Sequence, residues 1–324
     1  MRRKRITMAA SVLCLLMMAA CSSNQTADRQ QIKQVEKPRQ SEAPTLQEQT
    51  EATISKEQIR GVEVTVNGTT AYAISYKPSK EKDSYLYWEM GVPYGRDAIV
   101  DTEAMYQLYG QIAKVVSTKA DRAGKKETGI RGSSTSIAVT YTDKKDKAEA
   151  EYTTTLLIGD KEGDGYHCAR KGAETDALLV DATTIEGILG RAPFDLILKV
   201  PYVINLSTVS RVDLVAGKDT HTMEAADGTY RIDGKEVEKK DYCDRYSALL
   251  SPMIAKELSK SEKAKVGKEC LLKITYTRNL EDARNYEVGF YSYDDDYDAV
   301  SVNGETHFLV EKQEVENLID VLKV

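Results

Sequence analysis

The chain is poor in two of the three aromatic residues, with 3 Phe and 1 Trp against 19 Tyr in 324 residues. Beyond its first residues it also lacks a basic stripe, and its net charge is −6, which argues against a nucleic-acid partner. Charged residues make up 30% and apolar residues 41%, too polar a mixture for several membrane spans. The tyrosines suit strand packing, and a tyrosine-rich recognition surface is the alternative.

The usual catalytic signatures are missing too. The sequence contains no Gly-x-Ser-x-Gly elbow, no His-Glu-x-x-His pair, no phosphate-binding loop and no Gly-x-Gly-x-x-Gly after a strand. These absences leave an α/β-hydrolase serine, a zinc protease and the common nucleotide folds without support. A carboxylate pair for glycoside hydrolysis stays open, because spacing in sequence does not give spacing in space. We therefore expect a non-enzymatic chain and name no catalytic, cofactor-binding or metal-binding residue.

The five cysteines separate into three groups. Cys14 lies in an N-terminal signal, and Cys21 is discussed below. Cys168, Cys243 and Cys270 have no metal-ligand spacing, so free thiols are expected. Pairing of Cys243 with Cys270 stays open at this point.

The N-terminus has the pattern of a bacterial lipoprotein signal. A basic start is followed by an apolar run, 6–18, which is too short for a hydrocarbon core of ~30 Å. The run leads to Met-Ala-Ala-Cys at 18–21, which resembles a lipobox. We predict that 1–20 is a signal peptide that is removed and that Cys21 is acylated, for instance with palmitate. The protein would then be anchored by lipid to the extracytoplasmic face of the cell membrane.

The segment 21–58 should be a disordered tether. Residues 22–58 contain no aromatic side chain and are rich in Gln, Glu, Ser, Thr and Lys. Such a composition buries too little apolar surface to offset the entropy lost on ordering. A random coil of this length spans about 35 Å, enough to hold a domain clear of the lipid headgroups.

Strand and helix patterns divide the remainder into two halves, 59–205 and 206–324. The first half has alternating Val62, Val64 and Val66, a tight turn at Asn67-Gly68, a strand at 85–90 and a helix capped by Asp101. Further strands follow, and a capping box predicts that a second helix begins near Thr183.

The second half repeats this order. Hairpin strands at 209–216 and 221–225 precede a helix predicted over 241–258 with a kink at Pro252, then more strands and a last helix. Ile-Thr-Tyr-Thr at 274–277 is similar to Val-Thr-Tyr-Thr at 139–142. The expected fold is therefore α+β, with two similar halves of antiparallel hairpins covered by helices, and an internal duplication is the simplest account.

Several segments together resemble a known family. The lipobox, the polar tether and a strand with Trp88 are followed by LLIGD at 156–160, GYHC at 165–168 and GRAPFDL at 190–196. Across 62–324 the chain is similar to the bacterial domain-of-unknown-function family numbered 4340. The resemblance implies an anchored cell-envelope protein, because members of that family are often anchored in the envelope. Some members are similar to auxiliary subunits linked with ABC-type transporters and gliding-motility machinery. The family has no agreed enzymatic activity, so no site residues carry over.

Two acidic loops and three histidines need weighing as metal ligands. Asp160, Glu162 and Asp164 begin like a calcium loop, but Lys171 stands where an acid is required. Asp294, Asp296 and Asp298 with Glu305 come closer, yet Ala299 replaces the required glycine, so a solvated acidic turn is favoured. His167, His221 and His307 are isolated in strand-like runs.

Three functions follow in order of preference. The first is a protein-interaction module of the envelope, an accessory of an ABC-type transporter complex on the family resemblance. The second is a surface module that binds a ligand or glycan through exposed tyrosines between the halves. The third is a hydrolase of envelope polymers, which would need two close carboxylates with shifted pKa values.

Overall fold

The computed structural model describes residues 53–78, 86–118, 128–145, 148–280 and 285–322. They form two compact units, an N-terminal unit that ends at Ile197 and a C-terminal unit that begins at Leu198. The predicted signal peptide, Cys21 and most of the predicted tether lie outside the described residues. Folded structure begins before residue 59, because Ile54 is 3% exposed and its amide donates to the Ser117 hydroxyl at 3.0 Å.

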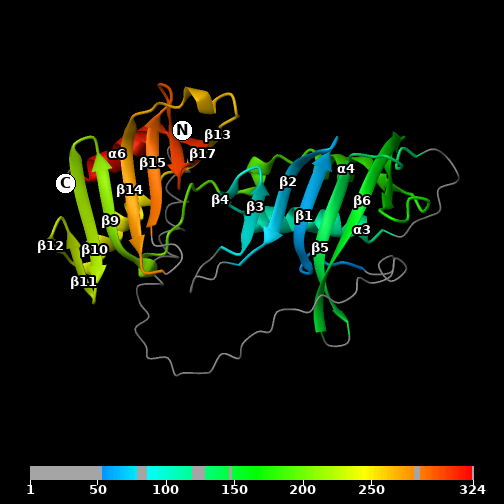
Figure 1. Ribbon diagram of the computed structural model, residues 1–324, viewed down its shortest axis with the longest axis horizontal. Coiled ribbons are helices and arrows are strands. Elements are labelled where there is room, and N and C mark those ends of the chain that lie inside the picture. The colour runs from blue at the N-terminus through cyan, green and yellow to red at the C-terminus, as the bar shows by residue number, and fades with distance from the viewer. Residues whose placement is uncertain (1–52, 79–85, 119–127, 146–147, 281–284, 323–324) are drawn as a thin grey trace, which may run out of the picture. The chain divides into compact units, whose positions relative to one another are not determined.

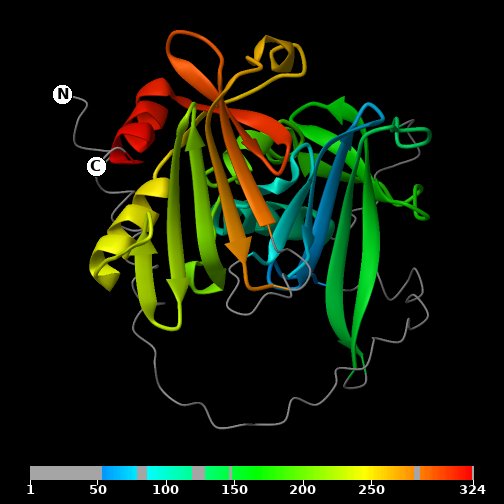
Figure 2. The same ribbon diagram turned by 60° about the vertical axis from the view of Figure 1, so that its left-hand side comes forward.

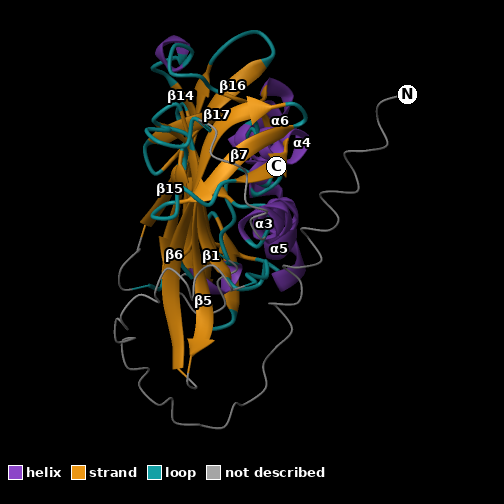
Figure 3. Ribbon diagram, turned by 90° about the vertical axis from the view of Figure 1, so that its right-hand side faces the viewer, coloured by secondary structure: helices purple, strands orange, loops and turns teal. Residues whose placement is uncertain are grey.

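The N-terminal unit is one antiparallel sheet of eight strands in the order β4-β3-β2-β1-β5-β6-β7-β8, with two helices on one face (Figures 1 and 3). The strands are β1 (Ile59–Val66), β2 (Thr69–Tyr76), β3 (Trp88–Val92), β4 (Gly95–Ile99), β5 (Ser136–Lys145), β6 (Ala148–Glu162), β7 (Gly165–Arg170) and β8 (Leu178–Asp181). The helices are α3 (Thr102–Val116) and α4 (Ala182–Leu189).

The first hairpin and the first helix form where the sequence predicts them. Asn67 and Gly68 have φ of 50° and 77°, as a tight turn between β1 and β2 requires. Asp101 caps α3 by accepting from the amides of Glu103 and Ala104. The apolar stripe of α3 is buried. Local sequence therefore places both elements.

Two predictions in this unit were wrong in detail. The strand predicted over 85–90 begins only at Trp88, and β4 follows it. The cap of α4 is Asp181, whose carboxylate accepts from the Thr184 amide at 2.8 Å, and not Thr183. Asp181 lies two residues before Thr183 and accepts from the Thr184 amide, so the helix starts before the predicted capping box.

The C-terminal unit is an antiparallel sheet of nine strands in the order β12-β11-β10-β9-β14-β15-β16-β17-β13. Figure 2 brings this unit forward, with α5 in yellow and α6 in red beside the sheet. Its strands are β9 (Val209–Ala216), β10 (Asp219–Ala226), β11 (Thr229–Ile232), β12 (Lys235–Glu236), β13 (Ile254–Glu257), β14 (Cys270–Arg278), β15 (Asn285–Ser292), β16 (Tyr297–Val302) and β17 (Glu305–Glu311). Its helices are α5 (Lys239–Leu249) and α6 (Lys312–Leu322).

The long kinked helix predicted over 241–258 does not form. Helix α5 ends at Leu249, and the strand β13 begins five residues later, at Ile254. Proline disfavours helical geometry in the residue before it, so Ser251-Pro252 ends the helix instead of bending it. The amide of Ile254 then donates to the Lys199 carbonyl at 2.8 Å, and this bond fixes the start of β13.

The two sheets share one strand order. Strands β9 to β12 of the C-terminal sheet correspond to β1 to β4 of the N-terminal sheet, and β14 to β17 correspond to β5 to β8. With this correspondence the two sheets have the same strand order, and β13 is an additional strand at one edge of the C-terminal sheet. The helices also occupy matching places, α3 and α5 before the second set of strands, α4 and α6 after it. The predicted α+β class with two similar halves is confirmed.

Tyrosine fills much of both cores. Six tyrosines are among the largest side chains that are fully buried: Tyr72, Tyr109, Tyr202, Tyr242, Tyr246 and Tyr276. Burial of the ring favours folding, while the hydroxyl needs a partner. The Tyr72 hydroxyl donates to the Ile188 carbonyl at 2.9 Å, and that of Tyr246 to the Ile204 carbonyl at 3.0 Å. Three of the six lie on α3 and α5, so tyrosine joins helix to sheet as well as strand to strand.

Candidate interaction surface

Trp88, the one tryptophan of the chain, lies at the centre of an aromatic cluster in the N-terminal unit. Its ring meets those of Tyr76, Tyr106 and Tyr109 edge to face, with centroids 5.2, 6.2 and 5.6 Å away. Tyr76 is the direct neighbour of Trp88 across the β2–β3 ladder, and both other tyrosines come from α3. Edge-to-face contacts between aromatic rings add about 0.5–1.5 kcal/mol each to the burial of their area. The cluster is therefore rigid.

Positively charged side chains surround this cluster. The Arg60 guanidinium lies over the Tyr76 ring, 5.4 Å from its centroid, and the Lys56 ammonium lies 6.0 Å from that of Tyr106. A cation over a ring is attracted by the negative face of the π system. On the opposite face of the same strand, Glu89 pairs with Lys77 at 3.3 Å and with Arg96 at 3.2 Å. Arg60 and Lys56 are therefore the cations that lie against the rings of the cluster.

Tyr76, in the cluster, is 42% exposed. Leu86 (40%) and Tyr87 (48%), which directly precede Trp88 in the chain, are exposed as well, so three of the six exposed large apolar residues in the described ranges lie at this end of β2 and β3. The Lys77 amide donates to the Tyr87 carbonyl at 2.9 Å, which holds residues 86–87, just before β3, against the end of β2. Tyr76, Leu86, Tyr87, Trp88, Arg60 and Lys56 are called the aromatic surface below. Tyr, Trp and Arg anchor most protein interfaces, and clustered exposed apolar side chains mark them.

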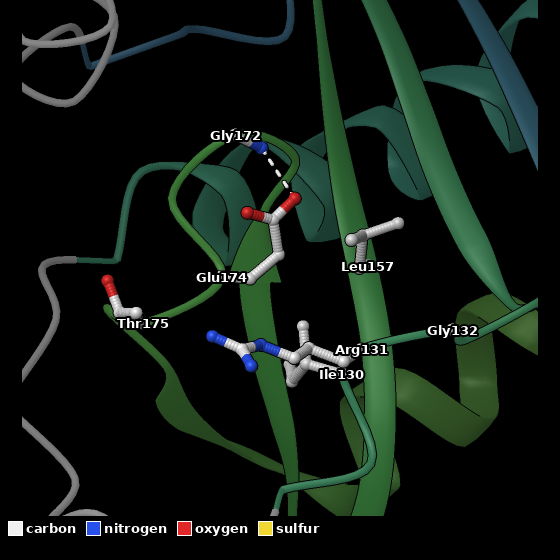
Figure 4. Close-up of a pocket in the computed structure, with 7 residues that line it drawn as sticks. All are labelled: Ile130, Arg131, Gly132, Leu157, Gly172, Glu174 and Thr175. Carbon is white, nitrogen blue, oxygen red and sulfur yellow. Dashed lines mark hydrogen bonds between the residues drawn. The ribbon is translucent and has the colours of Figure 1, made fainter.

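A second feature is a shallow hollow of about 370 Å³ at the end of the same sheet. It is lined by Ile130, Arg131, Gly132, Leu157, Gly172, Glu174 and Thr175. Figure 4 shows the Glu174 carboxylate turned back to the Gly172 amide, at 2.8 Å. That bond, more than the charge of Arg131, lowers the pKa of Glu174. The acid is thus used in shaping its own turn.

The three histidines predicted as isolated are held by separate partners. His167 Nε2 lies 2.8 Å from Glu162 in the N-terminal unit. In the C-terminal unit, His221 lies 2.8 Å from Asp233, and His307 lies 3.3 Å from the Lys263 ammonium. Burial, and then the charge of Lys263, lowers the pKa of His307. Each imidazole thus has a partner of its own.

The acidic loops do not converge on a cation either. Asp294 accepts from the amides of Asp296 and Tyr297 at 3.0 and 2.7 Å, which closes the turn between β15 and β16. Asp298 is 1% exposed within β16, and Glu305 begins β17 beyond another turn. No group of three or more His, Cys, Asp or Glu able to hold a metal occurs within the ranges that the structure describes.

Burial raises the pKa of two carboxyl groups, Asp298 and Glu314, both in the C-terminal unit. Glu314 accepts from the Met253 amide at 2.7 Å, so it fixes the chain between α5 and β13. Asp298 is buried in β16, with Lys312 opposing the effect of burial. Neither residue lines the hollow beside Arg131.

The three downstream cysteines are free thiols, so Cys243 and Cys270 do not pair. Cys168 is buried, and burial raises the pKa of its thiol to about 12, which makes it unreactive at neutral pH. Cys21 lies outside the described residues.

No family model, curated protein or solved structure matches this chain. Within the described ranges, none of the helices has both the length and the apolar character that a bilayer crossing demands.

The sequence pointed to Trp88 and to exposed tyrosines, but not to their combination. Tyr76 and Tyr87, the exposed pair, both belong to the N-terminal unit. The signal that was missed is the cross-strand register, which pairs Tyr76 with Trp88 across β2 and β3. Pairing β2 with β3 in this register would have placed the rings of Tyr76 and Trp88 on one face of the sheet.

Proposed function

We propose that this protein is a lipid-anchored, extracytoplasmic envelope protein that acts as a non-enzymatic protein-interaction module through its aromatic surface. The observation that carries the proposal is the combination of three exposed apolar residues with a rigid ring cluster and bordering cations. Rigid Tyr and Trp side chains lose little entropy on binding, and Arg adds directed hydrogen bonds. A protein surface with apolar anchors and acidic neighbours is the matching partner.

The anchor in this proposal is Cys21, followed by the tether to residue 53. One acyl chain holds a protein at a membrane only marginally, whereas two or more hold it stably. A diacylated Cys21 would therefore keep both units at the extracytoplasmic face of the cell membrane. Such a placement favours a partner in the envelope over one in free solution.

We further propose that the two units arose by duplication and that the chain is an accessory of an ABC-type transporter complex, as the resemblance to the family numbered 4340 suggests. The shared strand order supports the duplication. So does one matched pair of neighbours: Tyr141 faces Tyr152 across β5 and β6, and Tyr276 faces Tyr286 across β14 and β15.

Affinity purification from detergent-solubilised membranes tests the interaction. The wild-type chain should recover a defined envelope protein, and Tyr87→Ala should lose it. Truncation of a central anchor weakens an interface by about 2 kcal/mol, or roughly thirtyfold. Val215→Ala is the matched control, because Val215 is also exposed, at 40%, but lies in the other unit. Equal recovery by Tyr87→Ala and the control would refute a role for the aromatic surface.

A glycan ligand is the alternative that the exposed Tyr87 ring favours, since sugars stack on such rings. Trp88, as the sole tryptophan, makes intrinsic fluorescence a direct reporter of this surface. Saturable change in Trp88 emission with purified envelope polysaccharide, absent in Tyr87→Ala, would support the glycan reading over the protein partner.

A further inference from the structure

The strand β8 forms one edge of the N-terminal sheet, at the opposite end from β4. Its partner β7 pairs His167 with Leu179 and Tyr166 with Val180. The Ala182 amide donates to the Asp164 carbonyl at 2.8 Å, one step further along the same ladder. Along an antiparallel ladder, hydrogen-bonded residue pairs alternate with pairs that are not hydrogen-bonded. Since Ala182 is hydrogen-bonded, Val180 and Leu178 also bond to β7 through their main-chain groups. The amide and carbonyl of Leu179 therefore point away from the sheet.

The C-terminal unit shows what occupies the same place. There β17 takes the position of β8, and β13 pairs with its outer edge. Lys256 lies opposite Leu309, and the Leu258 amide donates to the His307 carbonyl at 2.8 Å. By the same alternation, the main-chain amide and carbonyl of Leu309 bond to β13. The corresponding amide and carbonyl of Leu179 point away from the sheet.

The leucine side chains at this position also differ in exposure between the two units. Leu309 is 3% exposed, because it packs with Ala299 and with Leu258 at the end of β13. Leu179 holds the equivalent position, opposite His167 as Leu309 is opposite Ala299, and is 52% exposed. One unit therefore covers this leucine with a strand of its own, and the other presents it.

Charge restricts what can pair here. Between 172 and 186 the chain carries four acids, Glu174, Asp176, Asp181 and Glu186, and no Lys or Arg; of the four, only Glu186 forms an ion pair among the described residues, with Lys161 at 2.8 Å. Asp181 lies two residues from Leu179 on the same face of the strand. A second copy of β8 would bring like charges together, whereas a basic segment would gain from them.

We propose that β8 is a docking site for an extended segment of a partner protein, which adds antiparallel to Leu178–Asp181 as β13 adds to β17. The segment has the pattern basic-x-apolar, since antiparallel pairing sets the apolar residue beside Leu179 and the basic residue beside Asp181. This site goes beyond the aromatic surface: it lies at the other edge of the sheet and uses main-chain hydrogen bonds.

The test uses the full chain in detergent and a labelled, unstructured peptide of about six residues. The peptide alternates threonine with apolar residues, one of which is leucine. Lysine replaces the apolar residue two positions before that leucine. Fluorescence anisotropy should show saturable binding, and hydrogen exchange at the Leu179 amide should slow on binding. Leu179→Lys, which blunts an edge strand, should weaken binding at least tenfold. Asp181→Asn keeps the helix cap and should weaken it about two- to fivefold, through the lost ion pair alone.

Two controls make the result decisive. Val215→Lys adds the same charge at an exposed position away from this edge and should bind as the wild type does. A peptide methylated on the amides that face β8 should not bind. Absence of binding to the wild-type chain, or binding that Leu179→Lys leaves unchanged, would overturn the proposal. So would a dimer in sedimentation that Leu179→Lys dissolves, because the occupant would then be a second copy. Leu179→Lys should leave recovery of the partner of the aromatic surface unchanged. Failure of the β8 proposal can therefore be distinguished from failure of the proposed function.

Discussion

The buried tyrosines predict cooperative unfolding at alkaline pH, and the structure sets its steepness. Burial raises the pKa of Tyr72 and Tyr109 in the N-terminal unit and of Tyr202, Tyr242 and Tyr246 in the C-terminal unit. It raises the pKa of Tyr276 in the C-terminal unit as well. Below pH 10 these hydroxyls are protonated in both the folded and the unfolded chain. Above pH 10 the unfolded chain loses the protons first, so the free energy of unfolding falls as pH rises.

Each such tyrosine costs about 1.4 kcal/mol per pH unit above 10. Two of them remove about 3 kcal/mol per pH unit from the N-terminal unit, and four remove about 5–6 kcal/mol from the C-terminal one. Against a typical stability of about 5–15 kcal/mol, the C-terminal unit should unfold first, roughly one to three pH units above 10.

Tyrosinate absorbance and far-ultraviolet circular dichroism, followed together against pH, measure this transition. The buried tyrosines should ionise only as secondary structure is lost. Tyr242→Phe removes one buried hydroxyl that has no partner among the described residues, so it should move the C-terminal transition to higher pH. Complete ionisation with an ordinary midpoint near 10, while the fold persists, would refute the burial of these rings.

Three further predictions concern single positions. Tyr72→Phe removes the hydroxyl that donates to the Ile188 carbonyl, which still accepts from the Arg191 amide at 3.4 Å, and should lower the free energy of unfolding by about 0.5–1.5 kcal/mol. Tyr109→Phe removes a buried hydroxyl with no partner among the described residues and should be neutral or stabilising; denaturant titration compares the two variants. Gly159→Ala would bring its Cβ against a main-chain oxygen and should cost about 1–3 kcal/mol, while Gly187→Ala, in open space on α4, should add about 0.5–1 kcal/mol by helix propensity. Cys21→Ser should leave a folded chain that acyl groups no longer hold at the membrane, and fatty-acid labelling of this variant would contradict the anchor.

Elements set by local sequence were predictable. Asn303 and Gly304 have φ of 50° and 92° and make the tight turn between β16 and β17, with the same Asn-Gly pair that predicted the turn at Asn67-Gly68. The Asp101 cap and the apolar stripe of α3 belong to the same class, because every residue involved lies within a few positions of the next.

Features set by distant pairing were not predictable. The segment Ile254–Glu257 forms a strand only because β17 offers it an edge, and its own pattern suggested helix. The aromatic surface needs the register between β2 and β3, and then the placement of α3 against both. Sequence alone supplied Trp88 and an excess of tyrosine, but not which rings meet.

Site-specific photo-crosslinking in intact cells tests whether the aromatic surface binds an envelope protein. A photoreactive residue replaces Tyr87, which is 48% exposed at the aromatic surface, or Val215, which is 40% exposed in the other unit. One discrete crosslinked envelope protein is expected from position 87 and none from position 215. The same product from both positions, or no protein product from position 87, would contradict it.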